Sequence, residues 1–160
     1  MVKSMVGVLG MLALAATAHA GGVKMQGVQQ QVQVASKDGK VIVTVSVDNG
    51  SARPVYVPKA VFEDKELFGR VFDLKDGSGK EVDYIGPMVK RGPYTKADYL
   101  AVKPGGKRSN SIDITRSYDF KPGAHTYTLS YSGNYLGDLA KIEATTEVAA
   151  APVKFSHTGK

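Results

Sequence analysis

Few residues of this sequence have the type and spacing that catalysis or metal binding requires. Beyond the first twenty residues there are two histidines, His125 and His157, and neither has a second histidine or a carboxylate at ligand spacing. His125 follows a Pro-Gly turn and is expected to be solvated, whereas His157 lies near the end of the chain, where disorder is the usual expectation. No His-Glu-x-x-His, Gly-x-Ser-x-Gly or phosphate-binding glycine loop is present. The sequence therefore predicts neither a metal site nor a cofactor.

Acidic residues can work as a general acid and base only where a cleft holds them together. The candidates Glu63-Asp64, Glu81 and Asp83 lie beside predicted turns or on alternating strand positions, where carboxylates are normally solvated. We therefore expect no catalytic residues and no enzyme activity.

The first twenty residues have the composition of a secretory signal peptide. Lys3 supplies a positive start, an apolar run extends from Met5 to Ala16, and Ala18-His19-Ala20 is a small-residue end. We expect a signal peptide at 1–20 and a single domain at 21–160, exported to the periplasm or secreted.

Charge and cysteine content narrow the range of partners. The 160-residue chain has no cysteine and a net charge of +6, which becomes +5 without Lys3. The domain must therefore be held by its core alone, and thiolate metal sites are excluded. The positive charge suits a partner with an acidic surface. The charges are scattered and no aromatic-rich basic platform is visible, so we expect no binding to nucleic acid. After the leader, no segment approaches the roughly 20 apolar residues of a membrane helix, so we expect no stable membrane insertion.

Short stretches with period-two alternation predict β-strands. The clearest runs from Val41 to Asp48, where four valines share one face. Val28–Ala35 indicates an exposed first strand, and the prolines of Pro54–Pro58 favour a short or edge strand. Residues 59–66 are ambiguous, with one helical turn as an option. The other expected strands are Leu67–Lys75 with Glu81–Ile85 as its hairpin partner, Tyr99–Val102, Ser109–Thr115, the stretch around Tyr127, Ile142–Val148 and Val153–Phe155.

A tyrosine after a Pro-Gly turn gives the fold a more specific signal. Tyr127 follows Pro122-Gly123, and an apolar residue, Leu129, stands two positions further on. This pattern matches the tyrosine corner of immunoglobulin-like domains, in which the hydroxyl bonds to upstream backbone. The sequence therefore predicts an all-β fold, an immunoglobulin-like antiparallel β-sandwich of about seven strands with its core at about 28–155.

The segment from Tyr84 to Tyr99 is the predicted functional loop. Two Gly-Pro pairs, Gly86-Pro87 and Gly92-Pro93, bracket the apolar pair Met88-Val89 and the basic pair Lys90-Arg91. Each proline fixes its own φ and biases the preceding residue toward an extended conformation, so a stiff, extended loop is expected. The residue types alone favour a surface connection whose cations are solvated.

The sequence around this loop resembles the N-terminal pro-domain of the deuterolysin-type zinc endopeptidases. This family, the aspzincins, includes the peptidyl-Lys metalloendopeptidases. The resemblance covers about Val28 to Phe155, and its most specific part is Tyr84-x-Gly86-x-x-x-Lys90-Arg91. Supporting matches are Leu67-Phe68, Val71-Phe72, Gly77-x-Gly79-Lys80-x-Val82, Asp98-Tyr99-Leu100 and Val102-x-Pro104-Gly105, with weaker ones at Tyr118-Asp119 and Pro122 to Tyr131.

In proteases of this family a zinc-binding catalytic domain with a His-Glu-x-x-His helix follows the pro-domain, and these 160 residues contain no such motif. The resemblance thus implies a pro-domain without its catalytic domain. Such a freestanding pro-domain would inhibit a separate zinc metalloendopeptidase or assist its folding. We expect Lys90 and Arg91 to be the anchors. Met88, Val89 and Tyr94 would form the apolar flank, Gly86 and Gly92 would be hinges, and Pro87 and Pro93 would hold the bound shape.

Two other functions stay open. The chain could be an envelope or extracellular interaction module that binds carbohydrate or another surface protein through its basic face and the tyrosines Tyr94, Tyr99, Tyr131 and Tyr135. Tyr127 and Tyr131 fit the sandwich core better. A small hydrolase is disfavoured because no catalytic constellation is present. When free, the protein is expected to be a monomer.

Overall fold

The computed structural model describes residues 27–160, so the predicted signal peptide lies outside the described part of the chain. Among these residues no helix has the length and apolar character to cross a membrane. The described elements are, in order, β1 (Val28–Lys37), β2 (Lys40–Asn49), β3 (Val55–Pro58), α1 (Lys59–Phe62), β4 (Asp73–Asp76), the 3-10 turn η1 (Lys96–Asp98), β5 (Tyr99–Val102), β6 (Lys107–Asp113), β7 (Gly123–Ser130), β8 (Ser132–Leu136), β9 (Thr145–Ala149) and β10 (Val153–Gly159).

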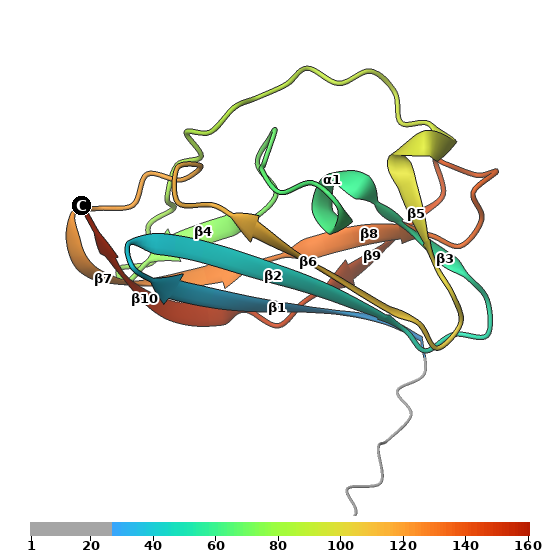
Figure 1. The fold of residues 1–160 in the computed structure, drawn as a ribbon, viewed down its shortest axis with the longest axis horizontal. Helices are drawn as coiled ribbons and strands as arrows, with labels where there is room; N and C mark the ends of the chain where they lie inside the picture. Colours follow the sequence, from blue (N-terminus) through green and yellow to red (C-terminus); the bar gives the residue numbers. More distant parts are fainter. Residues whose placement is uncertain (1–26) are drawn as a thin grey trace, which may run out of the picture.

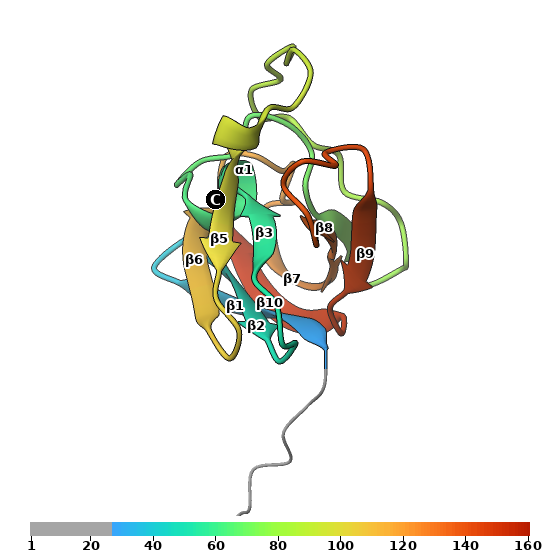
Figure 2. The same ribbon diagram turned by 90° about the vertical axis from the view of Figure 1, so that its right-hand side faces the viewer.

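The strands form three antiparallel sheets, with the orders β1-β2-β6, β10-β7-β4 and β5-β3-β8-β9. The sheets lie on different sides of a common interior (Figures 1 and 2). The expectation of an all-β antiparallel sandwich is confirmed. Ten strands are described rather than about seven, and several of the additional ones are only four or five residues long.

β2 is the centre of the first sheet, as its alternating sequence predicts. Its valines Val41, Val43, Val45 and Val47 are at most 1% exposed. Their opposite neighbours along the strand face outward and are half-buried. One row of side chains thus joins the core while the other stays accessible to solvent.

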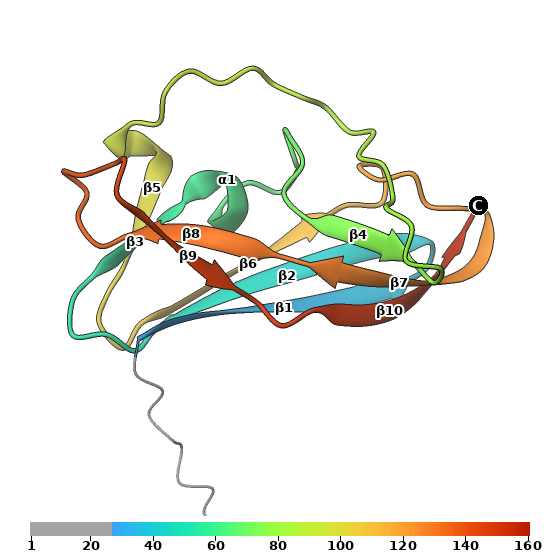
Figure 3. The ribbon, with the colours of Figure 1, turned by 180° about the vertical axis from the view of Figure 1, so that it is seen from behind.

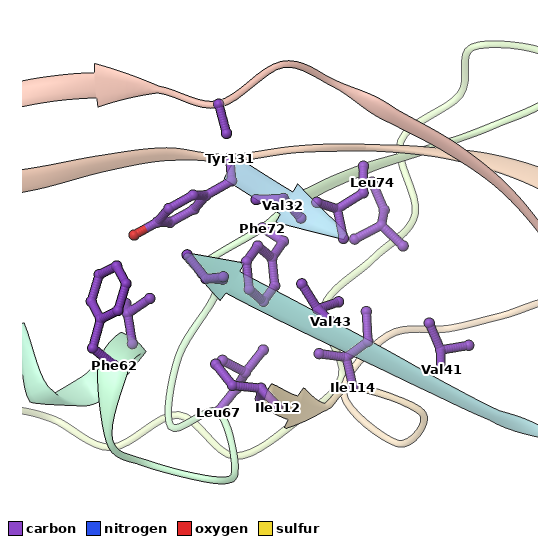
Figure 4. Close-up of a cluster of buried hydrophobic side chains, with 14 of the residues drawn as sticks. Val32, Val41, Val43, Phe62, Leu67, Phe72, Leu74, Ile112, Ile114 and Tyr131 are labelled. Atoms are coloured by element: carbon purple, nitrogen blue, oxygen red, sulfur yellow. The ribbon is translucent and has the colours of Figure 1, made fainter. Parts of the chain in front are cut away.

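A single cluster of buried hydrophobic side chains connects all three sheets and α1. Figure 4 shows Val32 of β1, Val43 of β2 and Leu74 of β4 directed into the same interior. The loops add to it, because Leu67 and Phe72 are 1% and 0% exposed although neither lies in a strand. The core therefore also holds the loop that precedes β4, through Leu67 and Phe72.

The predicted tyrosine corner is confirmed. The backbone N–H of Lys121 donates to the hydroxyl of Tyr127 at 3.1 Å, six residues upstream of the tyrosine. Tyr127 and Leu129 are both buried. The hydroxyl thus satisfies a backbone donor where the chain turns into β7.

Two strand predictions need correction. Leu67–Lys75 forms a strand only at β4, and Phe68, which the prediction placed in that strand, lies outside β4 and is 49% exposed. Glu81–Ile85 pairs only through isolated bridges, from Glu81 to Lys75 and from Tyr84 to Tyr118. Of the two alternatives for Pro54–Pro58, the short strand is confirmed, and β3 is not at an edge because it pairs with β5 on one side and β8 on the other.

The end of the chain is ordered, contrary to the expectation for His157. β10 continues to Gly159 and pairs with β7, so the core extends past residue 155. His157 is 4% exposed, its Nδ1 lies 2.8 Å from Ser36 Oγ, and its ring contacts Phe120. The alternation of Val153, Phe155 and His157 places the histidine on the inward face, which explains its burial.

Candidate functional site

The loop between Tyr84 and Tyr99 arches over one side of the molecule. It begins near β4, passes above α1 and ends at η1 and β5 (Figures 1 and 3). Residues 87–97 are all exposed. The predicted anchors Lys90 and Arg91 are therefore exposed, as are Met88, Val89 and Tyr94, and the Tyr94 ring lies 6.0 Å from that of Tyr99 at the start of β5.

The N-terminal end of the loop is fixed by Tyr84. The Tyr84 hydroxyl lies 2.7 Å from the Pro87 carbonyl and 3.3 Å from that of Leu67, so it can donate to either. Its ring packs edge-on against the buried Tyr118 at 5.4 Å. Burial raises the pKa of the Tyr84 phenol, which keeps the hydroxyl protonated and able to donate.

Backbone hydrogen bonds continue this attachment. The N–H groups of Ile85 and Gly86 both donate to the Ser117 carbonyl, at 2.9 and 3.2 Å, and the Val89 N–H donates to the Phe68 carbonyl at 3.0 Å. The loop is therefore attached to two other segments before it reaches the basic pair.

The two glycines, both predicted as hinges, have different surroundings. A Cβ on Gly86 would lie 2.7 Å from the Tyr84 hydroxyl and 2.8 Å from Cζ of its ring, whereas a Cβ on Gly92 would have no atom within 4 Å. Gly86 is thus required for the close approach of Tyr84. Gly92 has no comparable steric role.

The C-terminal end of the loop is held by charge. A terminal guanidinium nitrogen of Arg91 lies 3.8 Å from an Asp98 carboxylate oxygen, and the guanidinium is 5.0 Å from the centre of the Tyr94 ring. Asp98 also accepts hydrogen bonds from the backbone N–H and hydroxyl of Thr95. These bonds, the backbone one foremost, hold the pKa of Asp98 below its ordinary value, so the carboxylate stays charged opposite Arg91.

Lys90 differs from Arg91 in having no such attachment. Its side chain is exposed, and within residues 27–160 it has neither a hydrogen bond nor an ion pair. Its neighbours Met88 and Val89 are 79% and 57% exposed. A free ammonium group beside exposed apolar side chains can enter an acidic pocket without first breaking an internal contact.

The other residues considered for chemistry do not assemble into a site. His125 is exposed, with Nε2 2.8 Å from the Pro122 carbonyl. Glu81 forms an ion pair with Arg70, and Glu63 lies 3.8 Å from Arg108. The described residues hold no group of three or more histidine or acidic side chains placed to bind a metal.

The tyrosines offer little surface for a sugar. Tyr127 and Tyr131 are buried, as predicted, and so is Tyr118. Tyr99 and Tyr135 are half-buried, which leaves Tyr94, at 47% exposure, as the one exposed tyrosine in the described chain. It lies in the arching loop, so the loop is the place where an aromatic contact would be made.

The sequence did not indicate every residue of this site. The sequence predicts a strand at Phe68, and the hydrogen bond from the Val89 N–H to the Phe68 carbonyl joins positions 21 residues apart, which no local pattern reveals. The Asp98 contact could have been found, because Thr95-x-x-Asp98 has the spacing of a capping box, and both of its hydrogen bonds are present.

Comparisons with known proteins identify no family. No protein-family model matches the chain, and no curated protein matches it significantly. Among solved structures, a Bordetella pertussis protein assigned as ApaA has 15% sequence identity and a TM-score of 0.45, over 84% of this chain and 96% of its own. A Northeast Structural Genomics Consortium target has 10% identity and a TM-score of 0.41, over 82% and 83%. Similarity at this level assigns no function.

Proposed function

We propose that this protein is an exported, non-catalytic binding protein that blocks the cleft of a deuterolysin-type zinc metalloendopeptidase with its 84–99 loop, or assists the folding of that enzyme. The observation that carries the proposal is the state of Lys90. It is exposed, has no partner within the described residues, and stands beside Met88 and Val89 in a loop attached on both sides.

The attachment of the loop favours tight binding. A flexible loop loses conformational entropy when it enters a cleft, and holding it beforehand reduces that cost. Here Tyr84 and the Phe68 carbonyl hold one side, while Asp98 and Tyr94 hold the other. An extended segment presented in this way can align with a protease cleft by strand addition, with backbone hydrogen bonds giving affinity.

The two cations have different parts in this proposal. Lys90 enters an acidic specificity pocket, whereas Arg91 keeps its contacts with Asp98 and Tyr94 and positions its neighbour. The net positive charge of the chain adds long-range attraction to an acidic cleft and speeds encounter. Pro87 and Pro93 restrict the backbone on each side of the basic pair.

The test is inhibition of peptide cleavage by a purified deuterolysin-type peptidase. The double substitution of Lys90 and Arg91 by alanine should weaken inhibition by about 30-fold or more, as expected for the loss of central interface contacts. Lys90→Ala alone should account for most of this loss, and Arg91→Ala for less. Lys96→Ala removes an exposed cation from the same loop and is the control. Unchanged inhibition by the double variant would exclude the loop as the blocking element.

A further inference from the structure

Phe68 is an exposed aromatic side chain outside the 84–99 loop. It is 49% exposed, although the residue before it, Leu67, is 1% exposed and lies in the core. A buried neighbour fixes the backbone at this point, so Phe68 is presented to solvent from a rigid base.

The backbone places Phe68 against the loop. Its carbonyl accepts the hydrogen bond from Val89 N–H at 3.0 Å, and the Leu67 carbonyl lies 3.3 Å from the Tyr84 hydroxyl. Val89 is itself 57% exposed. Phe68 and Val89 therefore belong to one surface, although they come from different segments of the chain.

The large apolar residues that are exposed in the described part of the chain lie in the 84–99 loop and in the segment hydrogen-bonded to it. The large hydrophobic side chains that are exposed among residues 27–160 are Phe68 together with Ile85, Met88, Val89 and Tyr94 of the loop. Scattered exposed apolar residues are ordinary on protein surfaces, but here Phe68 and Val89 are joined by a backbone hydrogen bond next to the unpaired Lys90, and neighbouring apolar and charged side chains of this kind are typical of an interaction site. A role in folding does not account for the group, because all five side chains remain accessible in the folded chain.

We propose that Phe68 forms a second contact with the partner, seated in an apolar recess that borders the acidic pocket for Lys90. This inference rests on the proposed function and adds a specificity-determining residue to it. The occupant follows from the surface itself, because an apolar side chain and an unpaired ammonium group presented together are complementary to an apolar recess next to carboxylates.

The experiment measures inhibition of the same peptidase by Phe68→Ala and Phe68→Leu. Phe68→Ala should weaken inhibition by about tenfold or more, and Phe68→Leu by less because it keeps part of the apolar contact. The melting temperature should change little, since Leu67 keeps its place in the core. Gln33→Ala, at an exposed position on β1, is the matched control and should leave inhibition unchanged.

Two outcomes would overturn the inference. If Phe68→Ala inhibits as well as the unsubstituted protein while the Lys90 and Arg91 double variant does not, the blocking function stands and Phe68 has no part in it. If the unsubstituted protein does not inhibit at all, the proposed function and this inference both fail. Sedimentation velocity adds a further check, because concentration-dependent dimers lost on Phe68→Ala would show that a second copy covers this surface instead.

Discussion

The two ends of the 84–99 loop are held by different physical forces. At the N-terminal end, Tyr84 packs on a buried tyrosine and its hydroxyl bonds to backbone, with further bonds from Ile85 and Gly86 to Ser117. At the C-terminal end, the Arg91 guanidinium meets Asp98 and the Tyr94 ring on an exposed surface. The first attachment belongs to the core, whereas the second is open to solvent and salt.

This difference has a functional consequence for the proposed inhibitor. Exposed ion pairs contribute little to stability, and salt screens them. Salt does not screen packed aromatic contacts and backbone hydrogen bonds in this way. The N-terminal side should therefore keep its shape under most conditions. The C-terminal side can adjust when a partner approaches, and Lys90 lies between the two.

The largest expected effect comes from Gly86, because its replacement acts directly on the core attachment. In Gly86→Ala the new Cβ would collide with Tyr84, whose ring cannot easily move away from Tyr118. We expect a loss of about 1–3 kcal/mol in the free energy of unfolding, measured by urea denaturation. Trypsin should also cleave after Lys90 or Arg91 faster, because the loop is released.

Gly92→Ala is the matched control for this prediction. A Cβ there has no atom within 4 Å, and the φ of Gly92 lies outside the left-handed region. The substitution should be neutral, or should stabilise the protein by up to about 1 kcal/mol because alanine lowers the conformational entropy of the unfolded chain. Equal destabilisation by the two variants would contradict the assignment of a steric role to Gly86.

A smaller effect is expected from Tyr84→Phe, which removes only the hydroxyl. The ring and its contact with Tyr118 remain, so the loss should be about 1 kcal/mol, typical of one hydrogen bond. Trypsin should also cleave the loop faster in this variant than in the unsubstituted protein. Tyr135→Phe is the control, since the hydroxyl of that half-buried tyrosine has no hydrogen bond within the described residues. If both variants behave alike, the Tyr84 hydroxyl does not hold the loop.

The smallest effect is expected when the C-terminal end of the 84–99 loop is titrated with acid. The pKa of Asp98 is lower in the folded protein than its ordinary value of 3.8. The stabilisation that the Asp98 carboxylate gives to the fold is therefore complete above pH 3.8 and is lost as the pH falls through the lowered folded pKa. The Tyr94 ring signals in NMR spectra should shift over that acid range, while those of Tyr84 stay constant. Asp98→Asn should abolish the shift of Tyr94. A shift that persists in this variant would show that another group titrates near the ring.

The predictable parts of the fold are those in which local pattern and tertiary environment agree. β2 alternates because one face is buried, and the tyrosine corner is a short-range motif, so both were found from sequence. β8 was missed because Ser132-Gly133-Asn134 has the composition of a turn, although its residues pair with β9. Phe68 falls within the predicted strand Leu67–Lys75 because it has the same parity as Phe72, whereas the observed strand β4 begins only at Asp73.

The position and exposure of the 84–99 loop were predictable from the sequence, but the contacts that hold the loop were not. Two Gly-Pro pairs around a basic pair indicated an extended loop, and residues 87–97 are exposed as expected. What the loop touches depends on Leu67, Phe68 and Ser117, which are distant in sequence. The unequal roles of Gly86 and Gly92, and of Lys90 and Arg91, follow from those long-range contacts, which sequence spacing does not encode.

The contact between His157 and Ser36 links β10 to the end of β1, across 121 residues. The interior can close on the β1 side only after residues 153–159 have been synthesised. Removing β10 would therefore uncover the side of β1 that faces it.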